Sequence, residues 1–129
     1  MDAGTNYNIW VMRALGVDVG ARRVGLAISD PTGTLARPLT TLMVTNESDA
    51  VGRVVETIAR LGDEDDGLSL VVVGVPLRLD GTPNDATTRA RRFIDALQTR
   101  TAVPIAAEDE RLSSREAESR LALMVLPAS

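Results

Sequence analysis

ALGVDVGARRVGLAISD, residues Ala14–Asp30, is the stretch of sequence that decides the fold of this chain. Its two apolar runs, Ala14–Val19 and Val24–Ser29, are rich in residues that favour strands. A short return over Gly20–Arg23 joins them, which predicts an antiparallel hairpin. One acid, Asp18, lies within the first strand among apolar neighbours.

Asp18 needs an explanation because an unpaired carboxylate buried in an apolar strand costs several kcal/mol. The simplest explanation is a bound cation, and a cation held by carboxylates at the end of a strand is typical of phosphate chemistry. The alternative is that Asp18 caps the hairpin turn through its backbone. Asp residues that cap turns normally lie within the turn and not before the last residue of a strand, which favours the cation.

The composition of the 129 residues narrows the chemistry further. A hydrophobic content of 44% and a charged content of 25% are ordinary for one globular domain, and only 2% aromatic residues predict an aliphatic core. The chain has no Cys and no His, which excludes disulfides, thiolate or imidazole metal ligands, and Ser-His or Cys-His catalysis. A metal here would be a hard cation bound by oxygen, Mg²⁺ or Mn²⁺.

The distribution of charge bears on the partners. The formal net charge of −4 argues against a strong nucleic-acid binder. All 14 basic residues are Arg, which suits phosphate recognition, although a GC-rich coding bias is the simpler explanation. No apolar run is long enough for a membrane span and no secretory signal is visible, so we expect a cytoplasmic protein with no membrane partner.

Beyond the hairpin, the apolar pattern alternates between the periods of strands and helices. The elements that it predicts are a strand at about Leu35–Val44, a helix at about Glu47–Leu61, a strand at Leu70–Val75, a helix at about Asn84–Thr99, a strand at Val103–Ala107 and a last helix opening at Ser113. Residues 1–12 are expected to form a flexible tail before a single domain at residues 13–129.

This order of elements predicts a mixed five-stranded sheet, in which three antiparallel strands are followed by two parallel ones. Ligands of such sheets bind beyond the carboxyl ends of the parallel strands. Asp18, Pro76 and Glu110 each fall at the end of a strand, so we expect them along the same edge of the sheet.

Four motifs carry a resemblance to a known family, and they occur in order along the chain. They are GVDVGARRVGLAISD at residues 16–30, ARPL at 36–39, VVVGVPL at 71–77 followed by DGT at 80–82, and DERLSS at 109–114. Together they cover roughly Met12–Leu123 and resemble the YqgF (RuvX) family. The resemblance implies a ribonuclease H-like α/β fold with helices flanking the sheet. It also implies a nuclease, dependent on Mg²⁺ or Mn²⁺, that processes the 5′ end of precursor 16S rRNA by phosphodiester hydrolysis.

The resemblance assigns roles to two acids. Asp18 matches the family's first-strand acid and Glu110 matches the acid of its D-E-R motif, so both are expected to be metal ligands and catalytic residues. The family continues into another helix that carries a further acid in a V-D-x-x-A-A pattern. This sequence ends ALMVLPAS, so the C-terminal helix and a third catalytic acid are expected to be missing, which weighs against full activity.

The geometry of the sheet adds expectations about the neighbours of these acids. Neighbouring strands lie about 4.8 Å apart, so Asp18 and Glu110 would be separated by about 10 Å across one strand. The position between them must be small, which fits Gly74, although close helix–strand packing explains Gly74 equally well. Asp109 would point away from Glu110 and pair with an Arg or cap the next helix. Gly20, at the start of the return, is expected to be structural.

Contacts with the substrate are expected from arginines. Arg22 and Arg23 in the hairpin, Arg78 in the loop after the fourth strand, and Arg111 after Glu110 are candidates for gripping the nucleic-acid backbone. The expected partner is structured RNA, precursor 16S rRNA, with branched DNA as the other candidate. The chain is expected to be a monomer or a weak dimer.

Three other functions stay open. Holliday-junction cleavage requires two active sites on paired strands, so a stable dimer would favour it. The missing third acid also fits a non-catalytic nucleic-acid-binding or ribosome-assembly factor. A D-V-G hairpin also cradles nucleotide phosphate in actin-like and hexokinase-like ATPases, but those need two such domains around a cleft, and 129 residues provide one.

Overall fold

The computed structural model describes residues 13–29 and 36–110, which form an α/β domain. Five strands within these ranges make one mixed sheet. In spatial order they are β3 (Ala36–Met43), β2 (Arg23–Ser29), β1 (Ala14–Val19), β4 (Leu70–Val75) and β5 (Ile105–Asp109). The strands β3, β2 and β1 are antiparallel, and β1, β4 and β5 are parallel, which confirms the predicted architecture.

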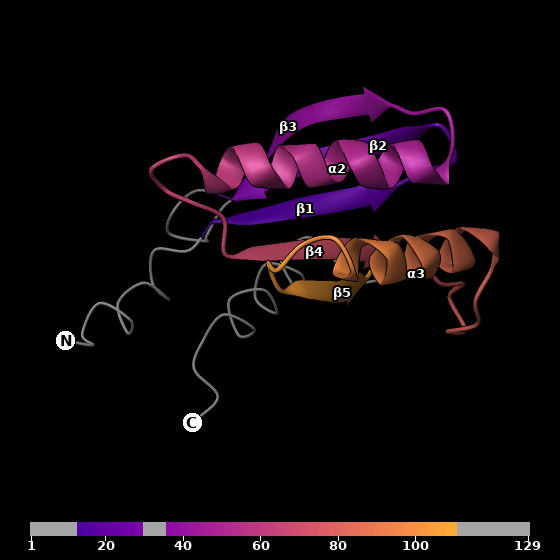
Figure 1. The fold of residues 1–129 in the computed structure, drawn as a ribbon. Helices are drawn as coiled ribbons and strands as arrows, with labels where there is room; N and C mark the ends of the chain where they lie inside the picture. Colours follow the sequence, from indigo (N-terminus) through magenta and orange to yellow (C-terminus); the bar gives the residue numbers. More distant parts are fainter. Residues whose placement is uncertain (1–12, 30–35, 111–129) are drawn as a thin grey trace.

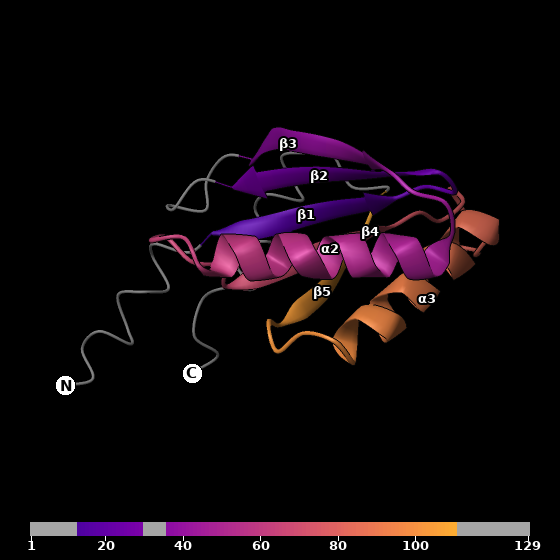
Figure 2. The same ribbon diagram turned by 45° about the horizontal axis from the view of Figure 1, so that its top comes forward.

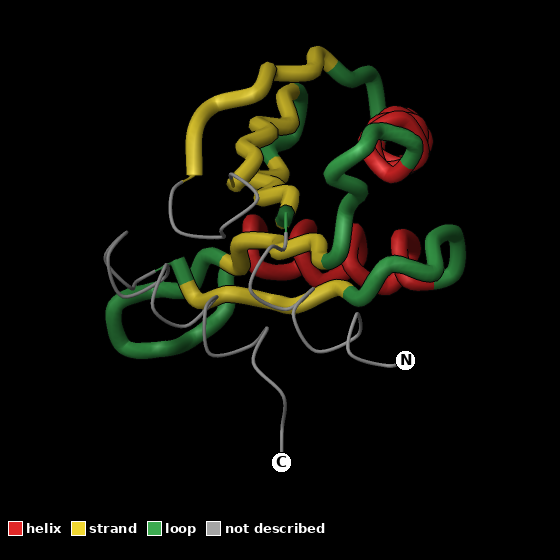
Figure 3. Tube along the Cα trace, turned by 90° about the vertical axis from the view of Figure 1, so that its left-hand side faces the viewer, coloured by secondary structure: helices red, strands yellow, loops and turns green. Residues whose placement is uncertain are grey.

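Two helices of the described part, α2 (Glu47–Gly62) and α3 (Asp85–Gln98), cover one side of the sheet. Both lie in front of the strands in Figure 1, and in Figure 2 α2 crosses in front of the strands while α3 lies below them. Figure 3 looks along α2 beside the strands. The Asn46 side chain caps α2 by accepting from the Asp49 N–H, and Asn84 forms a reciprocal capping box with Thr87 at the start of α3. The core beneath the helices is aliphatic apart from Phe93, as the composition predicts.

The return between β1 and β2 is tight. The Gly20 N–H donates to the Arg23 carbonyl oxygen at 2.8 Å and closes it. A Cβ on residue 20 would lie 2.9 Å from that oxygen, so glycine is required by this close approach. The tight return holds the carboxyl end of β1, where Asp18 lies, in place.

The bounds of β5 differ from the expected ones. This strand starts directly after Pro104, not at Val103, and extends to Asp109. Proline has no N–H to donate, and the Pro104 carbonyl oxygen accepts from the Val71 N–H at 2.9 Å as the ladder with β4 begins. The ladder then continues to the pair Val75–Asp109, so β5 carries acids within the strand as well as after it.

The two faces of the sheet differ in burial. Val17 and Val73 point toward the helices and are 3% and 0% exposed. By strand alternation, Gly16, Asp18 and Gly74 point to the opposite face, and Asp18 is exposed there. The face that α2 and α3 leave uncovered is therefore the one that carries a candidate site.

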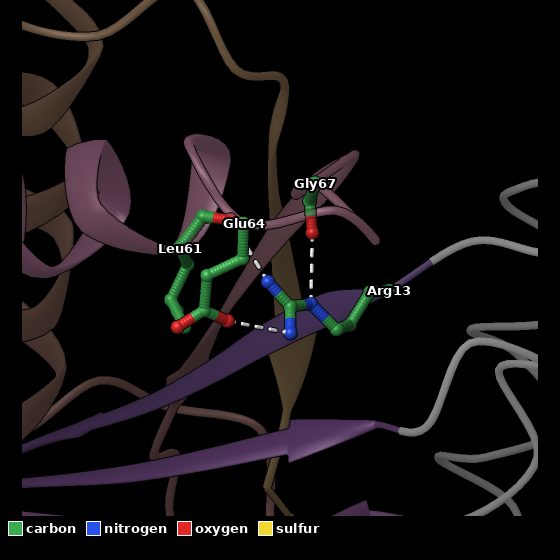
Figure 4. A network of polar contacts seen from close by, with 4 residues as sticks. All are labelled: Arg13, Leu61, Glu64 and Gly67. Atoms are coloured by element: carbon green, nitrogen blue, oxygen red, sulfur yellow. Dashed lines mark hydrogen bonds and ion pairs between the residues drawn. The ribbon is translucent and has the colours of Figure 1, made fainter.

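A buried arginine anchors the start of β1 to the end of α2 (Figure 4). The Arg13 guanidinium donates to the Leu61 carbonyl oxygen and to the Gly67 carbonyl oxygen, both at 2.8 Å. It also lies 2.9 Å from Oε1 of Glu64 in an ion pair. The first contact gives a donor to a carbonyl oxygen of the last turn of α2, and the second satisfies an oxygen of the turn that follows the helix. Arg13 thus holds the turn after α2 against the central strand.

Some expectations fall outside the described residues. They are the tail over residues 1–12 and the helix opening at Ser113. No helix of the described part is long and apolar enough to cross a membrane.

Candidate active site

Two acids from distant parts of the sequence meet on the open face of the sheet. Asp18 lies next to the end of β1, and Glu110 is the first residue after β5. The Glu110 N–H donates to the Val75 carbonyl oxygen at 3.2 Å, which carries the parallel ladder one step beyond the strand. From there the Glu110 side chain reaches across β4 and shares a hydrogen bond with the Asp18 carboxyl. The two acids that the sequence singles out are therefore brought into direct contact.

Gly74 is what lets them meet. A Cβ on residue 74 would lie 2.9 Å from Cδ and 3.0 Å from Cγ of Glu110, closer than real Cβ contacts allow. Gly74 does not have a positive φ, so its backbone conformation does not require glycine. The Glu110 side chain thus occupies the space that a side chain on the intervening strand would fill. This is the geometry expected of a small residue between two acids.

The paired carboxyls shift the pKa of Glu110. The pKa of Glu110 is raised from 4.5 to about 7, mostly by burial, with further contributions from the negative charge of Asp18 and from the hydrogen bond with Asp18. Near neutral pH the pair therefore holds a proton that an ordinary surface glutamate has lost. A site of this kind attracts a cation, because a divalent ion can replace the shared proton and remove the repulsion.

Asp18 itself corrects one expectation. The interpretation of Asp18 as a buried carboxylate is wrong, since its side chain is exposed. Its strand neighbours Val17 and Val19 point to the buried face, so alternation turns Asp18 outward. The proximity of Glu110 to Asp18, and not the cost of burying Asp18, is therefore what favours a cation at this place.

The acid pair lies in a groove of about 750 Å³ on the open face. Glu108 and Asp109 also line it, and Thr40 and Thr41 of β3 line it on the other side. Small residues lie between these two walls, among them Gly16, Gly25 and Ala27. The groove therefore runs across the strands with its carboxylates at the β5 side and hydroxyls at the β3 side.

Sequence reasoning missed Glu108. It pairs with Gly74 in the ladder between β4 and β5 and is 7% exposed. Glu108 and Glu110 are two residues apart, and side chains two residues apart on a strand point to the same face. A predicted strand that reached Asp109 would therefore have placed both acids on one face. Among the described residues no group of three or more acids is placed to hold a metal ion. Asp18 and Glu110 form a pair of carboxylates above Gly74, and carboxylate oxygens are the donors that hard cations prefer.

Three of the predicted substrate-gripping arginines, Arg22, Arg23 and Arg78, lie in the part of the chain that the structure describes. Arg22 and Arg23 are exposed at the β1–β2 return, at the Asp18 end of the sheet. The Arg78 guanidinium turns back on its own loop and donates to the Pro83 carbonyl oxygen at 2.6 Å. None of these three lines the groove. Arg111 lies outside the described residues.

Comparison with solved structures defines the class of fold. The structure of T. thermophilus RuvC in complex with a Holliday junction substrate is similar with a TM-score of 0.56 at 18% identity, over 89% of this chain and 78% of that one. The large terminase nuclease from the thermophilic phage G20c is similar with a TM-score of 0.50 at 17% identity, over 88% of this chain and 54% of that one. The domain has the ribonuclease H-like fold.

Sequence comparison then identifies the family. The RuvX family, described as "Holliday junction resolvase", matches residues 12–126, and the chain belongs to this family, also called YqgF. A relative from Anaeromyxobacter sp. (strain K), named "Putative pre-16S rRNA nuclease", is 43% identical over 110 residues, which are 85% of this chain and 77% of the relative. The family and the fold expected from the four motifs are confirmed.

Proposed function

We propose that this protein is a metal-dependent nuclease that hydrolyses phosphodiester bonds of precursor 16S rRNA near its 5′ end. The observation that carries the proposal is the contact of Asp18 and Glu110 above Gly74, in a groove open along the sheet. The name of the Anaeromyxobacter relative supports rRNA as the substrate. The ribonuclease H-like fold of RuvC and of the terminase nuclease agrees with hydrolysis of a phosphodiester at this place.

Asp18 and Glu110 would hold Mg²⁺ or Mn²⁺, which supplies charge neutralisation on the phosphate and an activated water. The backbone of Asp18 is held by the pairing of β1 with β2 and β4, so the position of its carboxylate in the site is fixed. Glu110 lies just beyond β5, and its pKa is raised to about 7, so metal binding would compete with a proton on this side chain. Gly74 leaves the space in which the two carboxylates converge.

The four predicted arginines would bind the substrate backbone. Arg22 and Arg23 stand at the end of the sheet where Asp18 lies, and their guanidinium groups suit phosphate oxygens. Arg78 is placed by its own loop, and Arg111 directly follows Glu110 in the sequence. A few such contacts on an acidic chain predict weak binding that falls with added salt.

Cleavage of a defined RNA tests the proposal. The substrate is a 16S rRNA fragment with its precursor 5′ extension, assayed with Mn²⁺ and with EDTA beside a fragment that starts at the mature end. We expect metal-dependent removal of the extension, loss of cutting in Asp18→Asn, and wild-type cutting in Asp95→Asn, a matched change on the exposed side of α3. Metal-dependent cutting that survives in Asp18→Asn would overturn the assignment of the site.

A second candidate substrate is a four-way DNA junction, which the description of the family and the RuvC fold favour. A resolvase acts on two strands with two sites, so it requires a stable dimer. The same assay with a junction, combined with the molar mass in solution, separates the two substrates. Paired symmetric cuts by a dimer would support a resolvase, whereas binding of either substrate without any cut would indicate a non-catalytic binding or assembly factor.

A further inference from the structure

One row of residues crosses three strands of the groove. Asp18 of β1 pairs with Gly25 of β2, and Gly25 pairs with Thr41 of β3. Neighbouring strands lie about 4.8 Å apart, so Thr41 stands roughly 10 Å from Asp18 with Gly25 between them. The row places a hydroxyl group across the groove from the acid pair.

The side chains of this row point into the groove. Val24 and Leu42, the next pair along β2 and β3, pack against the core on the helix side. Gly25 and Thr41 therefore point to the opposite face, and both line the groove together with Asp18. Thr41 is exposed, so its hydroxyl is accessible from the groove.

The space above Gly25 is open. A Cβ on residue 25 would meet only Cβ of Asp18 within 4 Å, at an ordinary 3.8 Å. Gly25 does not have a positive φ, so neither its backbone conformation nor close packing requires glycine. Glycine weakens a strand interior and is found where a ligand or another backbone approaches closely. The groove thus has a bare floor at Gly25, with carboxylates on one side and a hydroxyl on the other.

We propose that this floor seats the ribose beside the cleaved phosphate, and that the Thr41 hydroxyl hydrogen bonds to its 2′-hydroxyl. The inference rests on the proposed nuclease function and adds to it a residue that selects RNA over DNA. A 2′-hydroxyl both donates and accepts hydrogen bonds, and it is the group that distinguishes RNA from DNA. A threonine hydroxyl can complement it in either direction. Thr41 acts on specificity only, because it does not touch the reacting phosphate.

The test compares two substrates that differ only in the 2′-hydroxyl groups of the two sugars that flank the cleaved bond. One is the all-ribose precursor strand, and the other has 2′-deoxyribose on both sides of the cleaved bond. We expect wild-type kcat/KM with Mn²⁺ to favour the all-ribose strand by roughly tenfold, the scale of one hydrogen bond. Thr41→Val, which removes the hydroxyl at nearly constant shape, is expected to cut both strands at the same rate. Thr41→Ser is expected to keep the preference.

Two outcomes of this comparison would overturn the inference. They are a wild type with no preference for ribose, and a Thr41→Val variant that keeps the wild-type ratio. The matched control is Thr88→Val on α3, an exposed threonine that does not line the groove. It is expected to keep both the rate and the ratio.

A second variant tests the floor independently of the hydroxyl. Gly25→Val fills the open space, and valine favours strands, so the melting temperature is expected to stay or rise. Cleavage and RNA binding are expected to fall at least roughly tenfold, because a filled floor no longer admits the sugar. A stable Gly25→Val protein that still cleaves at the wild-type rate would overturn the inference.

Binding distinguishes failure of this inference from failure of the nuclease assignment. If the wild type cuts neither strand, the nuclease proposal fails, and the affinities for the two strands are then compared without cleavage. A ribose preference in binding that is present in the wild type and lost in Thr41→Val supports the inference. Equal affinities of the wild type for the two strands overturn it.

Discussion

The carboxyl of Glu110 occupies the space above Gly74 where a side chain of β4 would otherwise be. A Cβ on residue 74 would lie 2.9 Å from Glu110 Cδ, so the two cannot coexist in this arrangement. Because β4 lies between β1 and β5, the absence of a side chain at Gly74 is what allows Glu110, after β5, to contact Asp18 of β1. The acid pair depends on glycine as much as on the acids themselves.

Gly74→Ala is therefore expected to separate the acids without unfolding the protein. The atoms in the way belong to the end of a flexible side chain, which can move, and alanine is more favourable than glycine in a strand. The melting temperature should stay or rise, while metal-dependent cleavage should fall at least roughly tenfold. Gly62→Ala, at the open end of α2 where a Cβ meets nothing within 4 Å, is the matched control and should cleave normally. Full activity of Gly74→Ala would contradict this role.

Asp18→Asn is expected to lower the cleavage activity and to keep or raise the stability of the metal-free protein. Losing one of two carboxylates should lower metal-dependent cleavage by at least roughly 100-fold. The metal-free protein should be as stable as the wild type or more so at pH 8, since the repulsion between Asp18 and Glu110 is gone. Thermal unfolding in EDTA and the RNA assay measure the two effects. A marked fall in melting temperature would show that Asp18 has a structural role that its exposed position does not explain.

The stability of the metal-free protein is expected to fall as the pH rises from about 4.5 to about 7. The folded state holds the Glu110 proton with a pKa of about 7, whereas an ordinary glutamate loses it near 4.5. Between these values the folded state binds more protons than the unfolded state, so raising the pH favours unfolding. Melting temperatures in EDTA, taken as the difference between wild type and Glu110→Gln, isolate this effect. A difference that is flat across this range would contradict the raised pKa.

Mg²⁺ or Mn²⁺ is expected to stabilise the wild type and to have a smaller effect at low pH. A cation at about 100 times its Kd adds about 2.7 kcal/mol to the free energy of unfolding. The rise in melting temperature should shrink below pH 7, where protons compete for Glu110, and should vanish in Glu110→Gln. Glu56→Gln, an exposed change on α2, should respond as the wild type does. An equal rise in Glu110→Gln would place the cation elsewhere.

Arg13→Met is expected to destabilise the fold by about 2–4 kcal/mol. The change removes the guanidinium that donates to the Leu61 and Gly67 carbonyl oxygens, beside a strand at the centre of the sheet (Figure 4). The Leu61 oxygen keeps only the longer bond from the Glu64 N–H, at 3.2 Å. Glu64→Gln removes only the half-exposed partner of the ion pair and should cost less than about 1 kcal/mol. Urea unfolding of both variants measures the difference. Equal losses would mean that the ion pair, and not the backbone hydrogen bonds, dominates the anchor.

Local patterns predicted most of the fold. The Ala14–Ser29 hairpin, the apolar run of Leu70–Val75 and the helical period of α2 each depend on neighbours in the sequence, and each lies where it was predicted. The bounds of β5 were missed because they depend on which N–H groups find a partner on β4. Pro104 shifted the start, and pairing with Val75 extended the end.

The sequence predicted which acids form the candidate site, but it did not predict how their side chains are arranged. The motifs identify Asp18 and Glu110, but their contact requires Gly74 on the strand between them. The exposure of Asp18 was misjudged because an apolar strand can bury one face and leave the other open. The place of Thr41 opposite Asp18 follows from the register of three strands, which sequence spacing alone does not define.

The sequence by itself determined the order of the elements, the hard-oxygen character of any metal site and the family, because residue types and their periodicity encode these directly. Only the tertiary structure decided that the Glu110 carboxyl contacts Asp18, that its pKa rises to about 7 and that a bare floor separates the pair from Thr41. These features arise between strands that are distant in the chain. Their physical cause is the pairing of neighbouring strands, because the absent side chains of Gly74 and Gly25 leave the space in which the other groups lie.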